Sequence, residues 1–252
     1  MKTMIQGKKI VKSFGNGQEK VRVLNDVDIQ IEEGQFVAIM GPSGSGKSTL
    51  MYGLSGMDTI DFGEVTFDGQ VINQMNEVEL ADLRRQKMGF IFQQPTFLKN
   101  LSIIDNIILP SLKEKKGGVD ELVKRAETLM RKVGISELKD RKINQVSGGQ
   151  LQRAGICRAL MGQPRVIFGD EPTGALNSKV AQEILTILSK INEEGTTIIV
   201  VTHDAKVAAQ SERVLFVGDG QLVGELYLGK FTNQELESRM ELVAQTVLKT
   251  EI

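Results

Sequence analysis

Residues 36 to 55 contain the feature that most constrains the fold of this chain. Five apolar residues, Phe36 to Met40, run directly into Gly41-Pro42-Ser43-Gly44-Ser45-Gly46-Lys47-Ser48, and Ser48 to Ser55 have helical composition. The pattern predicts a buried strand, a tight loop and a helix in succession. Glycines allow several backbone N–H groups to converge on one point, where the helix N-terminus adds positive potential. The segment therefore predicts a phosphate-binding loop.

This loop assigns roles to two side chains. In such a loop Lys47 reaches the terminal phosphates of a nucleotide and Ser48 binds Mg²⁺. The alternative is a plain glycine-rich turn. A full match to G-x-x-x-x-G-K-[ST] arises from composition alone in on the order of one chain in a hundred of this length, and the strand and helix on either side weaken that alternative further.

Other apolar runs predict an α/β fold around the loop. Continuous apolar strands are expected at Arg165 to Phe168 and at Thr196 to Val201, separated by an amphipathic helix from Ser178 to Asn192 that Gly195 ends. Buried strands that alternate with helices indicate a mostly parallel sheet. From Lys8 to Phe36, short β-branched segments alternate with polar turns, which predicts an antiparallel β portion at the N-terminus.

Two helical regions complete the expected organisation. A helical insert is predicted at about residues 94 to 160 within a domain of residues 1 to 228, and a helical tail at residues 229 to 252. The tail places Leu236, Met240, Val243 and Val247 on one helix face. We expect this face to pack on the tail's own domain, with docking to a partner as the alternative.

Composition excludes several classes of protein. The chain has 31 Lys and Arg against 32 Asp and Glu, a balance that argues against a duplex nucleic acid as partner. A single cysteine, Cys157, excludes an intrachain disulfide and a cysteine-rich zinc site, and fits a reducing compartment. The polar start does not resemble a secretory signal, and no apolar run approaches the ~18 to 20 residues that span a bilayer. We expect a cytoplasmic protein that meets a membrane only through a partner.

A pair of carboxylates follows the predicted strand near residue 168. Val166-Ile167-Phe168-Gly169 leads into Asp170 and Glu171, at the sheet edge where open α/β folds place their ligands. We expect Asp170 to hold Mg²⁺ through its water shell, and Glu171 to act as the general base that polarises the water attacking a γ-phosphate. The alternative is a solvated acidic turn before Pro172. The presence of a phosphate loop in the same chain argues against this alternative.

One four-residue segment and two single residues are further candidates for nucleotide contacts. Ser147 and Gln150 fit a helix capping box, while Gly148 and Gly149 between them expose N–H groups at a helix N-terminus, a second anion-binding surface. His203, the only histidine, follows an apolar strand at the same edge and suits a hydrogen bond to the γ-phosphate. Gln93 follows Phe90-Ile91-Phe92, and its amide oxygen suits Mg²⁺ or water.

Taken together, these motifs resemble the nucleotide-binding domain of ABC transporters. The resemblance covers residues 4 to 228 and rests on GPSGSGKST (residues 41 to 49), Gln93, VSGGQ (146 to 150), FGDEP (168 to 172) and His203. It implies an ATPase that uses Mg²⁺, with VSGGQ contacting the nucleotide held by a second ATPase subunit, commonly an identical copy. It also implies that Phe14 stacks on adenine, with packing inside a strand as the alternative, and that Gln93 senses Mg²⁺.

Finer features resemble one group within that family. FVAIMGPSGSGKSTL, FIFQQPTFLKNLSIIDNIILP and the ending EPTGALNSK resemble the macrolide-exporter and lipoprotein-release group, with GALNSK nearest to its bacitracin-type peptide-resistance branch. This implies an FtsX-like permease as partner and a position on the inner face of the membrane. Alternatives are a regulatory ATPase of cell division with a similar permease, and a soluble ABC ATPase that acts on ribosomes or DNA.

One departure from the family pattern concerns Asn177, where the family normally has aspartate. Both residues cap helices about equally well, so the helix from Ser178 is expected to be unaffected. The family's aspartate helps to join the two ATP sites of the dimer. We therefore expect the absence of the aspartate to change either the rate of ATP hydrolysis or the coupling between the two sites.

Overall fold

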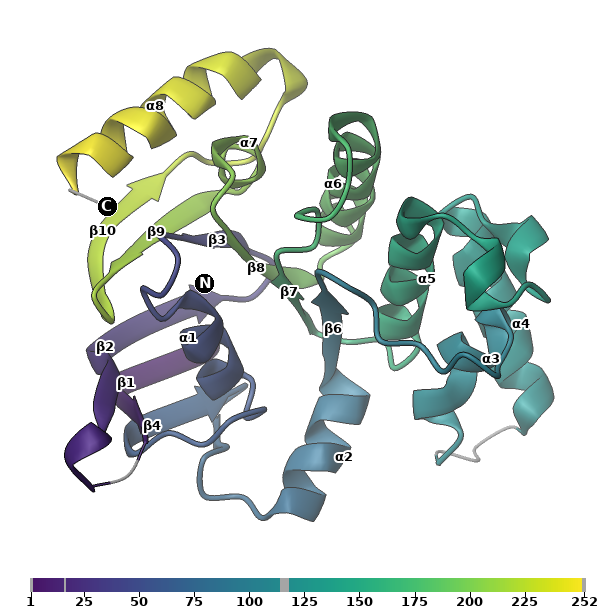
Figure 1. Cartoon of the computed structure of the whole chain (residues 1–252), viewed down its shortest axis with the longest axis horizontal. Coiled ribbons are helices and arrows are strands. Elements are labelled where there is room, and N and C mark those ends of the chain that lie inside the picture. Colours follow the sequence, from purple (N-terminus) through teal and green to yellow (C-terminus); the bar gives the residue numbers. More distant parts are fainter. Residues whose placement is uncertain (1, 16, 114–117, 251–252) are drawn as a thin grey trace. The chain divides into compact units, whose positions relative to one another are not determined.

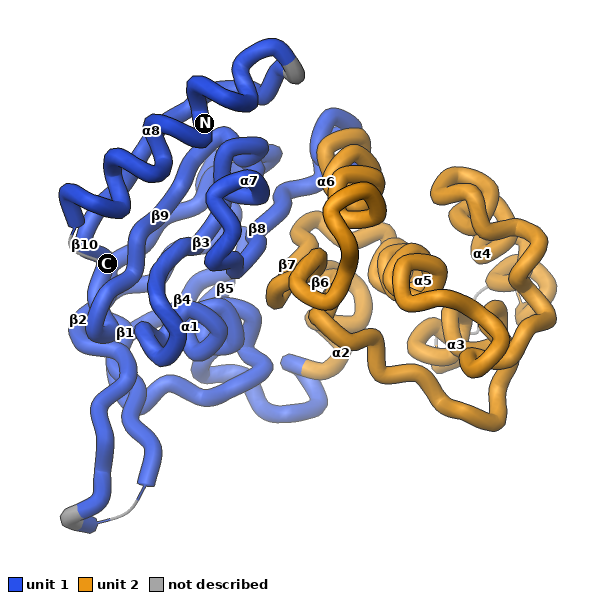
Figure 2. Tube along the Cα trace, turned by 45° about the horizontal axis from the view of Figure 1, so that its top comes forward, with its two compact units in different colours: residues 1–80, 191–252 blue, residues 81–190 orange. Residues whose placement is uncertain are grey.

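The computed structural model describes residues 2–15, 17–113 and 118–250 (Figure 1). The chain divides into two compact units (Figure 2). Unit 1 comprises Met1–Leu80 and Ile191–Ile252, and unit 2 comprises Ala81–Lys190. Each unit carries some of the residues predicted to contact a nucleotide.

Unit 1 contains the strand that leads into the phosphate loop. Strand β3 (Phe36–Met40) is buried at every residue and pairs in parallel with both β8 (Thr197–Thr202) and β9 (Arg213–Gly218). β10 (Gln221–Tyr227) adds antiparallel to β9. Helices α1 (Lys47–Leu54) and α7 (Ala205–Ala208) follow β3 and β8. Helices that follow buried parallel strands give the α/β arrangement the sequence predicts.

An antiparallel sheet forms the rest of the N-terminal portion of unit 1. Its order is β2-β1-β4-β5, and its strands are β1 (Thr3–Phe14), β2 (Val21–Glu32), β4 (Phe62–Phe67) and β5 (Gln70–Val71). The burial of β2 alternates from Val27 onward, with Val27, Ile29 and Ile31 facing the core. This period of two is the pattern of a sheet with one buried face.

The C-terminal helix α8 (Leu236–Lys249) belongs to unit 1 and contacts α7 and β10. Val243 is fully buried on its inner face. The guanidinium of Arg239, only 5% exposed, donates hydrogen bonds to the backbone carbonyls of Gly229 at 3.0 Å and Ser211 at 3.4 Å. An apolar stripe and one buried arginine therefore hold α8 on its own unit.

Unit 2 combines two parallel strands with most of the helices. Strand β6 (Met88–Phe92) pairs with β7 (Val166–Asp170) in register, so that Phe92 lies beside Asp170. The helices are α2 (Glu77–Lys87), which begins in unit 1, α3 (Ile103–Ile108), α4 (Val119–Lys132), α5 (Gly148–Leu160) and α6 (Ser178–Glu193), which ends in it. Short 3-10 turns occupy Gly17–Glu19, Leu109–Ser111, Ser136–Leu138, Ile143–Gln145 and Asn233–Glu235.

The α/β fold class predicted from the sequence is confirmed. The bounds of β3, β7, β8 and α6 agree with the predicted ranges within two residues, whereas the antiparallel portion begins at Thr3, before the predicted Lys8. β3 matches its predicted range, while β7 and β8 each run beyond the predicted last residue. Helix α6 ends just before Gly195, whose φ of 99° is the left-handed conformation that commonly ends helices. Among the described residues, no helix combines the length and apolar character needed to cross a bilayer.

The near-neutral charge of the chain conceals a division between the units. Unit 2 carries 19 Lys and Arg against 11 Asp and Glu, a net charge of +8. Unit 1 carries the remaining 12 Lys and Arg against 21 Asp and Glu, a net charge of −9. The chain therefore consists of one acidic and one basic unit.

Candidate active site

The predicted phosphate loop connects β3 to α1 in unit 1. Gly44 and Gly46 have φ values of 82° and 99°, left-handed conformations that glycine adopts without steric cost. At Gly41 a Cβ atom would overlap the carbonyl oxygen of Val217 on β9. These glycines are required because the loop turns tightly and passes close to the neighbouring strand.

Two side chains inside the loop fit a phosphate ligand. Lys47 is 7% exposed, and its Nζ donates a 2.6 Å hydrogen bond to the carbonyl oxygen of Pro42, so its charged end lies over the loop. The hydroxyl of Ser45 is buried and has no hydrogen-bond partner among the described residues. A buried hydroxyl without a partner costs free energy that an acceptor such as a phosphate oxygen would offset. Ser48 and Thr49 are partly buried in the first turn of α1.

His203 lies at the same sheet edge as the loop. Strands β3 and β8 run parallel with Met40 beside Thr202, so Gly41 and His203 both leave the sheet at its carboxyl edge. His203 is exposed, and the next residue, Asp204, caps α7 by accepting a hydrogen bond from the backbone N–H of Lys206. Ligands of open α/β sheets bind at this edge.

In unit 2, Gln93 and Glu171 emerge side by side. Because Phe92 and Asp170 are paired residues of β6 and β7, the residues that follow them leave the two strands together. Both side chains approach the backbone of Gly174, which has no Cβ atom to obstruct them. Gly174 also donates its backbone N–H to the carbonyl of Glu171 at 3.0 Å, which closes the turn after β7.

Glu171 has an uncommon backbone conformation. Its φ is 45°, in the left-handed region that non-glycine residues rarely adopt, and it precedes Pro172, a context that favours extended backbone instead. Such strain costs about 1 to 3 kcal/mol and is enriched at functional positions. The turn after β7 therefore holds the carboxylate of Glu171 in a position that an ordinary strand end would not give.

The donor atoms expected for Mg²⁺ are a hydroxyl, an amide oxygen and a carboxylate oxygen, from Ser48, Gln93 and Asp170. These hard oxygen ligands suit Mg²⁺, which usually takes one or two carboxylates together with phosphate oxygens and water. Ser48 lies in unit 1, and the other two follow paired strands of unit 2. The chemistry of this donor set fits the ion.

The Ser147 to Gln150 segment forms a reciprocal helix cap. Ser147 Oγ accepts the backbone N–H of Gln150 at 3.3 Å, while Gln150 Oε1 accepts the backbone N–H of Ser147 at 2.8 Å. Ser147 and Gly148 are exposed at the start of α5. At Gly149, a Cβ atom would lie 2.5 Å from Cγ1 of Val180 on α6, so glycine is needed there for packing. The capping box predicted from the sequence is therefore present.

Phe14 ends β1 with 46% of its surface exposed. Lys12 Nζ lies 5.0 Å from the centre of its ring, within the range of a cation–π contact. The exposure disagrees with the alternative of a strand aromatic packed in the core. A ring with this exposure is accessible for stacking on a planar ligand.

The structure thus arranges the predicted residues in two groups. Unit 1 holds Phe14, the loop from Gly41 to Thr49 and His203, and unit 2 holds Gln93, Ser147 to Gln150, Asp170 and Glu171.

Sequence reasoning missed two residues that support the unit 2 group. Gln152 and Gly174 contact the segments that carry Gln93 and Glu171. One signal was available: Gln152 shares a helix face with the buried Ile156 and Ala159, and a glutamine on an apolar face has a buried partner.

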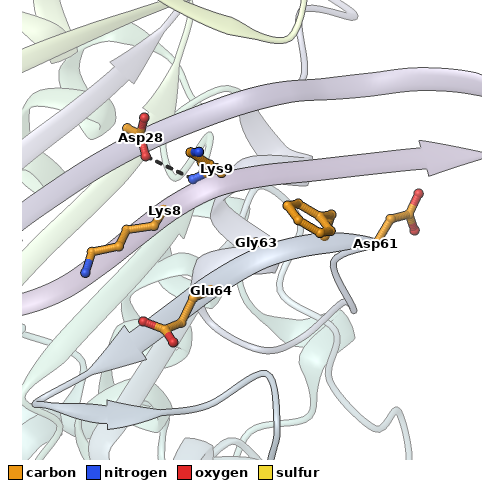
Figure 3. Close-up of a pocket in the computed structure, with 7 residues that line it drawn as sticks. Lys8, Lys9, Asp28, Asp61, Gly63 and Glu64 are labelled. Carbon is orange, nitrogen blue, oxygen red and sulfur yellow. Dashed lines mark hydrogen bonds between the residues drawn. The ribbon is translucent and has the colours of Figure 1, made fainter.

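A separate pocket lies on the antiparallel sheet of unit 1 (Figure 3), and it contains none of the predicted site residues. Its volume is about 550 Å³, and the backbone N–H of Lys9 donates a 2.9 Å hydrogen bond to Asp28 at its wall. The other lining residues are Lys8, Asp61, Phe62, Gly63 and Glu64. Its mixed charges do not match a nucleotide site.

The sequence of this chain is similar to those of known ABC transporter proteins. The model of the ABC transporter family matches residues 24–174. The bacitracin export ATP-binding protein BceA of Halalkalibacterium halodurans is 42% identical over 234 residues, which cover 92% of this chain and 91% of that protein. The macrolide export ATP-binding/permease protein MacB of Mannheimia succiniciproducens is 42% identical over 222 residues, 88% of this chain. The chain spans only about a third of MacB, 34% of its length.

The fold of this chain is also similar to solved structures of ABC transporter cassettes. The dimeric structure of MJ0796, described as a bacterial ABC transporter cassette, superposes with a TM-score of 0.84 at 40% identity and covers 90% of this chain and all of that one. A second MJ0796 structure, of a post-hydrolysis state bound to ADP and Pi, gives the same TM-score at 39% identity. With the phosphate loop, the carboxylate pair and the VSGGQ cap all in place, this chain belongs to the ABC transporter family, as one of its ATP-binding cassettes.

Proposed function

We propose that this chain is the ATP-hydrolysing subunit that energises an export-type membrane permease, and that it works as a pair of copies. The observation that carries the proposal is the match over nearly the full length of the bacitracin export ATP-binding protein, which is itself a cassette of this size. The proposal extends to Phe14, the loop, Gln93, the VSGGQ residues, the carboxylates and His203 as the working site.

The chemistry of hydrolysis is assigned to residues of both units. The loop N–H groups and Lys47 hold the phosphates of ATP, and His203 donates a hydrogen bond to the γ-phosphate. Glu171 accepts the proton of the attacking water, a general-base contribution of about 10²- to 10⁴-fold. Ser48, Gln93 and Asp170 would hold Mg²⁺, which neutralises charge on the phosphates when bound.

Pairing of two copies follows from the exposed VSGGQ cap. Ser147 and Gly148 present the N-terminus of α5 to solvent, and a helix N-terminus attracts phosphate. We propose that this surface binds the ATP held by the phosphate loop of the second copy, head to tail. The dimeric MJ0796 structure supports a pair of such cassettes.

The proposals for the permease and its cargo rest on the names of the relatives. BceA is named for bacitracin export and MacB for macrolide export, so we propose a peptide-antibiotic or similar cargo and an FtsX-like permease that holds the cassette on the inner face of the membrane. A cell-division regulator or a soluble ATPase that acts on ribosomes or DNA would share the cassette and lack this cargo.

Two measurements test the proposal. Glu171→Gln should bind ATP and lose at least 99% of its hydrolysis, while the exposed Glu137→Gln in the same unit keeps it. Rapid turnover by the first variant contradicts the role of Glu171.

The second measurement is capture of tagged Glu171→Gln with Mg-ATP from detergent-solubilised membranes. Recovery of a many-spanning FtsX-like permease with a large extracellular insert supports peptide export. Recovery with ribosomes or DNA and without a membrane protein overturns the transporter assignment.

A further inference from the structure

Gln152, in the second turn of α5, connects three parts of unit 2. Its side chain is 1% exposed, and its Nε2 donates one hydrogen bond to the carbonyl oxygen of Phe92 at 3.0 Å and another to that of Pro172 at 2.7 Å. Phe92 directly precedes Gln93, and Pro172 directly follows Glu171. One buried amide therefore ties the backbone beside both residues to the helix that begins with VSGGQ.

Few side chains can replace this amide. It uses both of its N–H groups on carbonyls at the end of β6 and in the turn after β7, whereas a glutamate would place a carboxylate against two acceptor oxygens. A methionine of similar length would leave both carbonyls without this donor. The position therefore selects for glutamine on chemical grounds.

A second contact joins the same helix to the segment after Gln93. Arg158 Nη1 donates a 2.6 Å hydrogen bond to the carbonyl oxygen of Thr96, and its guanidinium lies 4.5 Å from the centre of the Phe97 ring. Gln152 and Arg158 lie in successive turns of α5, and both donate hydrogen bonds to carbonyl oxygens of the segment from Phe92 to Thr96. Helix α5 is thus bound at two points to the segment from Phe92 to Phe97.

We propose that Gln152 is a positioning residue that couples the VSGGQ end of α5 to Gln93 and Glu171 of the same copy. The inference rests on the pairing of two copies proposed above. When the VSGGQ surface of one copy binds the ATP of the other, the displacement of α5 is passed through Gln152 to the two residues that act on the first copy's own ATP. Gln152 is therefore the link by which one ATP site senses the other.

The test uses the full-length chain and compares Gln152→Met with wild type. We expect binding of a fluorescent ATP analogue to be unchanged, because the phosphate loop lies in unit 1. The kcat of ATP hydrolysis should fall roughly 10-fold, which corresponds to about 1.4 kcal/mol. The Hill coefficient for ATP should fall to 1, and the Mg²⁺ concentration for half-maximal rate should rise, since Gln93 is no longer fixed.

A second variant addresses the possibility that Gln152→Met destabilises the fold. Arg158→Met breaks the other fastening of α5 and leaves only the exposed Thr96 without a donor, so it should fold normally and lower the Hill coefficient. The matched controls are Gln86→Met and Arg131→Met, both exposed in unit 2, and both should keep wild-type cooperativity.

The outcomes separate this inference from the proposed function. Cooperative wild-type hydrolysis that persists in both Gln152→Met and Arg158→Met overturns the inference alone. Wild-type protein that neither hydrolyses ATP nor pairs overturns the proposed function and, with it, the inference. Loss of cooperativity in the two variants with retained nucleotide affinity supports the link.

Discussion

The side chains of Gln93 and Glu171 meet over a residue that has no side chain of its own: a Cβ atom on Gly174 would lie 2.9 Å from Gln93 Nε2 and 3.0 Å from Glu171 Oε2. Both distances are too short for a methyl group. Since both neighbours are the ends of flexible side chains, they would move aside while the backbone stays in place. Gly174 therefore keeps the two functional groups close together.

Gly174→Ala should consequently fold and bind ATP but hydrolyse it roughly 10-fold more slowly, a loss of about 1.4 kcal/mol in transition-state stabilisation. The control is Gly155→Ala in α5, where the new Cβ would meet only Pro95, at an ordinary 3.5 Å. Steady-state ATPase kinetics of both variants decide the matter. Equal rates in the two would contradict the role given to Gly174.

The left-handed backbone of Glu171 predicts a conflict between stability and activity. Glu171→Gly and Glu171→Ala both remove the carboxylate, but only glycine adopts a φ of 45° without steric cost. We expect both variants to lose hydrolysis and the glycine variant to be more stable than the alanine variant by about 1 kcal/mol. Thermal unfolding measures the difference, and an alanine variant at least as stable as the glycine one would refute the strain.

Asn177 caps helix α6, and substitution by aspartate would give this position the negative charge that the family pattern has. Its Oδ1 accepts the backbone N–H of Val180 at 3.0 Å at the start of α6. Asn177→Asp keeps this bond and adds a negative charge at a helix N-terminus, a gain of about 0.3 to 1 kcal/mol. Asn177→Ala should cost about 0.5 to 2 kcal/mol.

The aspartate variant also tests whether this position couples the two ATP sites. If the charge contributes, Asn177→Asp raises the Hill coefficient of ATP hydrolysis above that of wild type. If the Hill coefficient is unchanged while the stability rises, the residue acts only as a helix cap.

Burial raises the pKa of the Cys157 thiol from 9.0 to about 12. Because the unfolded chain loses this proton at lower pH than the folded one, the stabilisation is complete below pH 9.0 and is lost as pH rises toward 12. Native protein should resist iodoacetamide at pH 8 and react only when unfolded. Between pH 9 and pH 11, the free energy of unfolding of Cys157→Ala should fall less than that of wild type. Equal decreases in the two proteins would contradict the raised pKa of the buried thiol.

The local parts of the fold were predictable because their signals are local. The apolar run of β3 and the glycines after it determine a strand and a loop within 13 residues, from Phe36 to Ser48, and the Ser147–Gln150 cap needs only a spacing of three. The role proposed for Phe14 comes from the resemblance to a family, and the one proposed for Gln93 comes from that resemblance together with its place after an apolar strand.

Other features depend on contacts between distant residues. The bonds of Gln152 join positions 60 and 20 residues away, and no pattern along α5 specifies those partners. The conformation of Glu171 opposes the preferences of its own residue type and of the proline after it, so tertiary packing must impose it. Division of the chain into an acidic and a basic unit was hidden because the total charge is close to zero.

That division has a consequence for how two copies meet. With net charges of −9 on unit 1 and +8 on unit 2, copies that approach with like units facing repel one another, and copies that approach head to tail attract. Opposite potentials of this kind raise association rates and act over about 8 Å at physiological ionic strength. Lower ionic strength should therefore raise the fraction of collisions in which unit 1 of one copy faces unit 2 of the other.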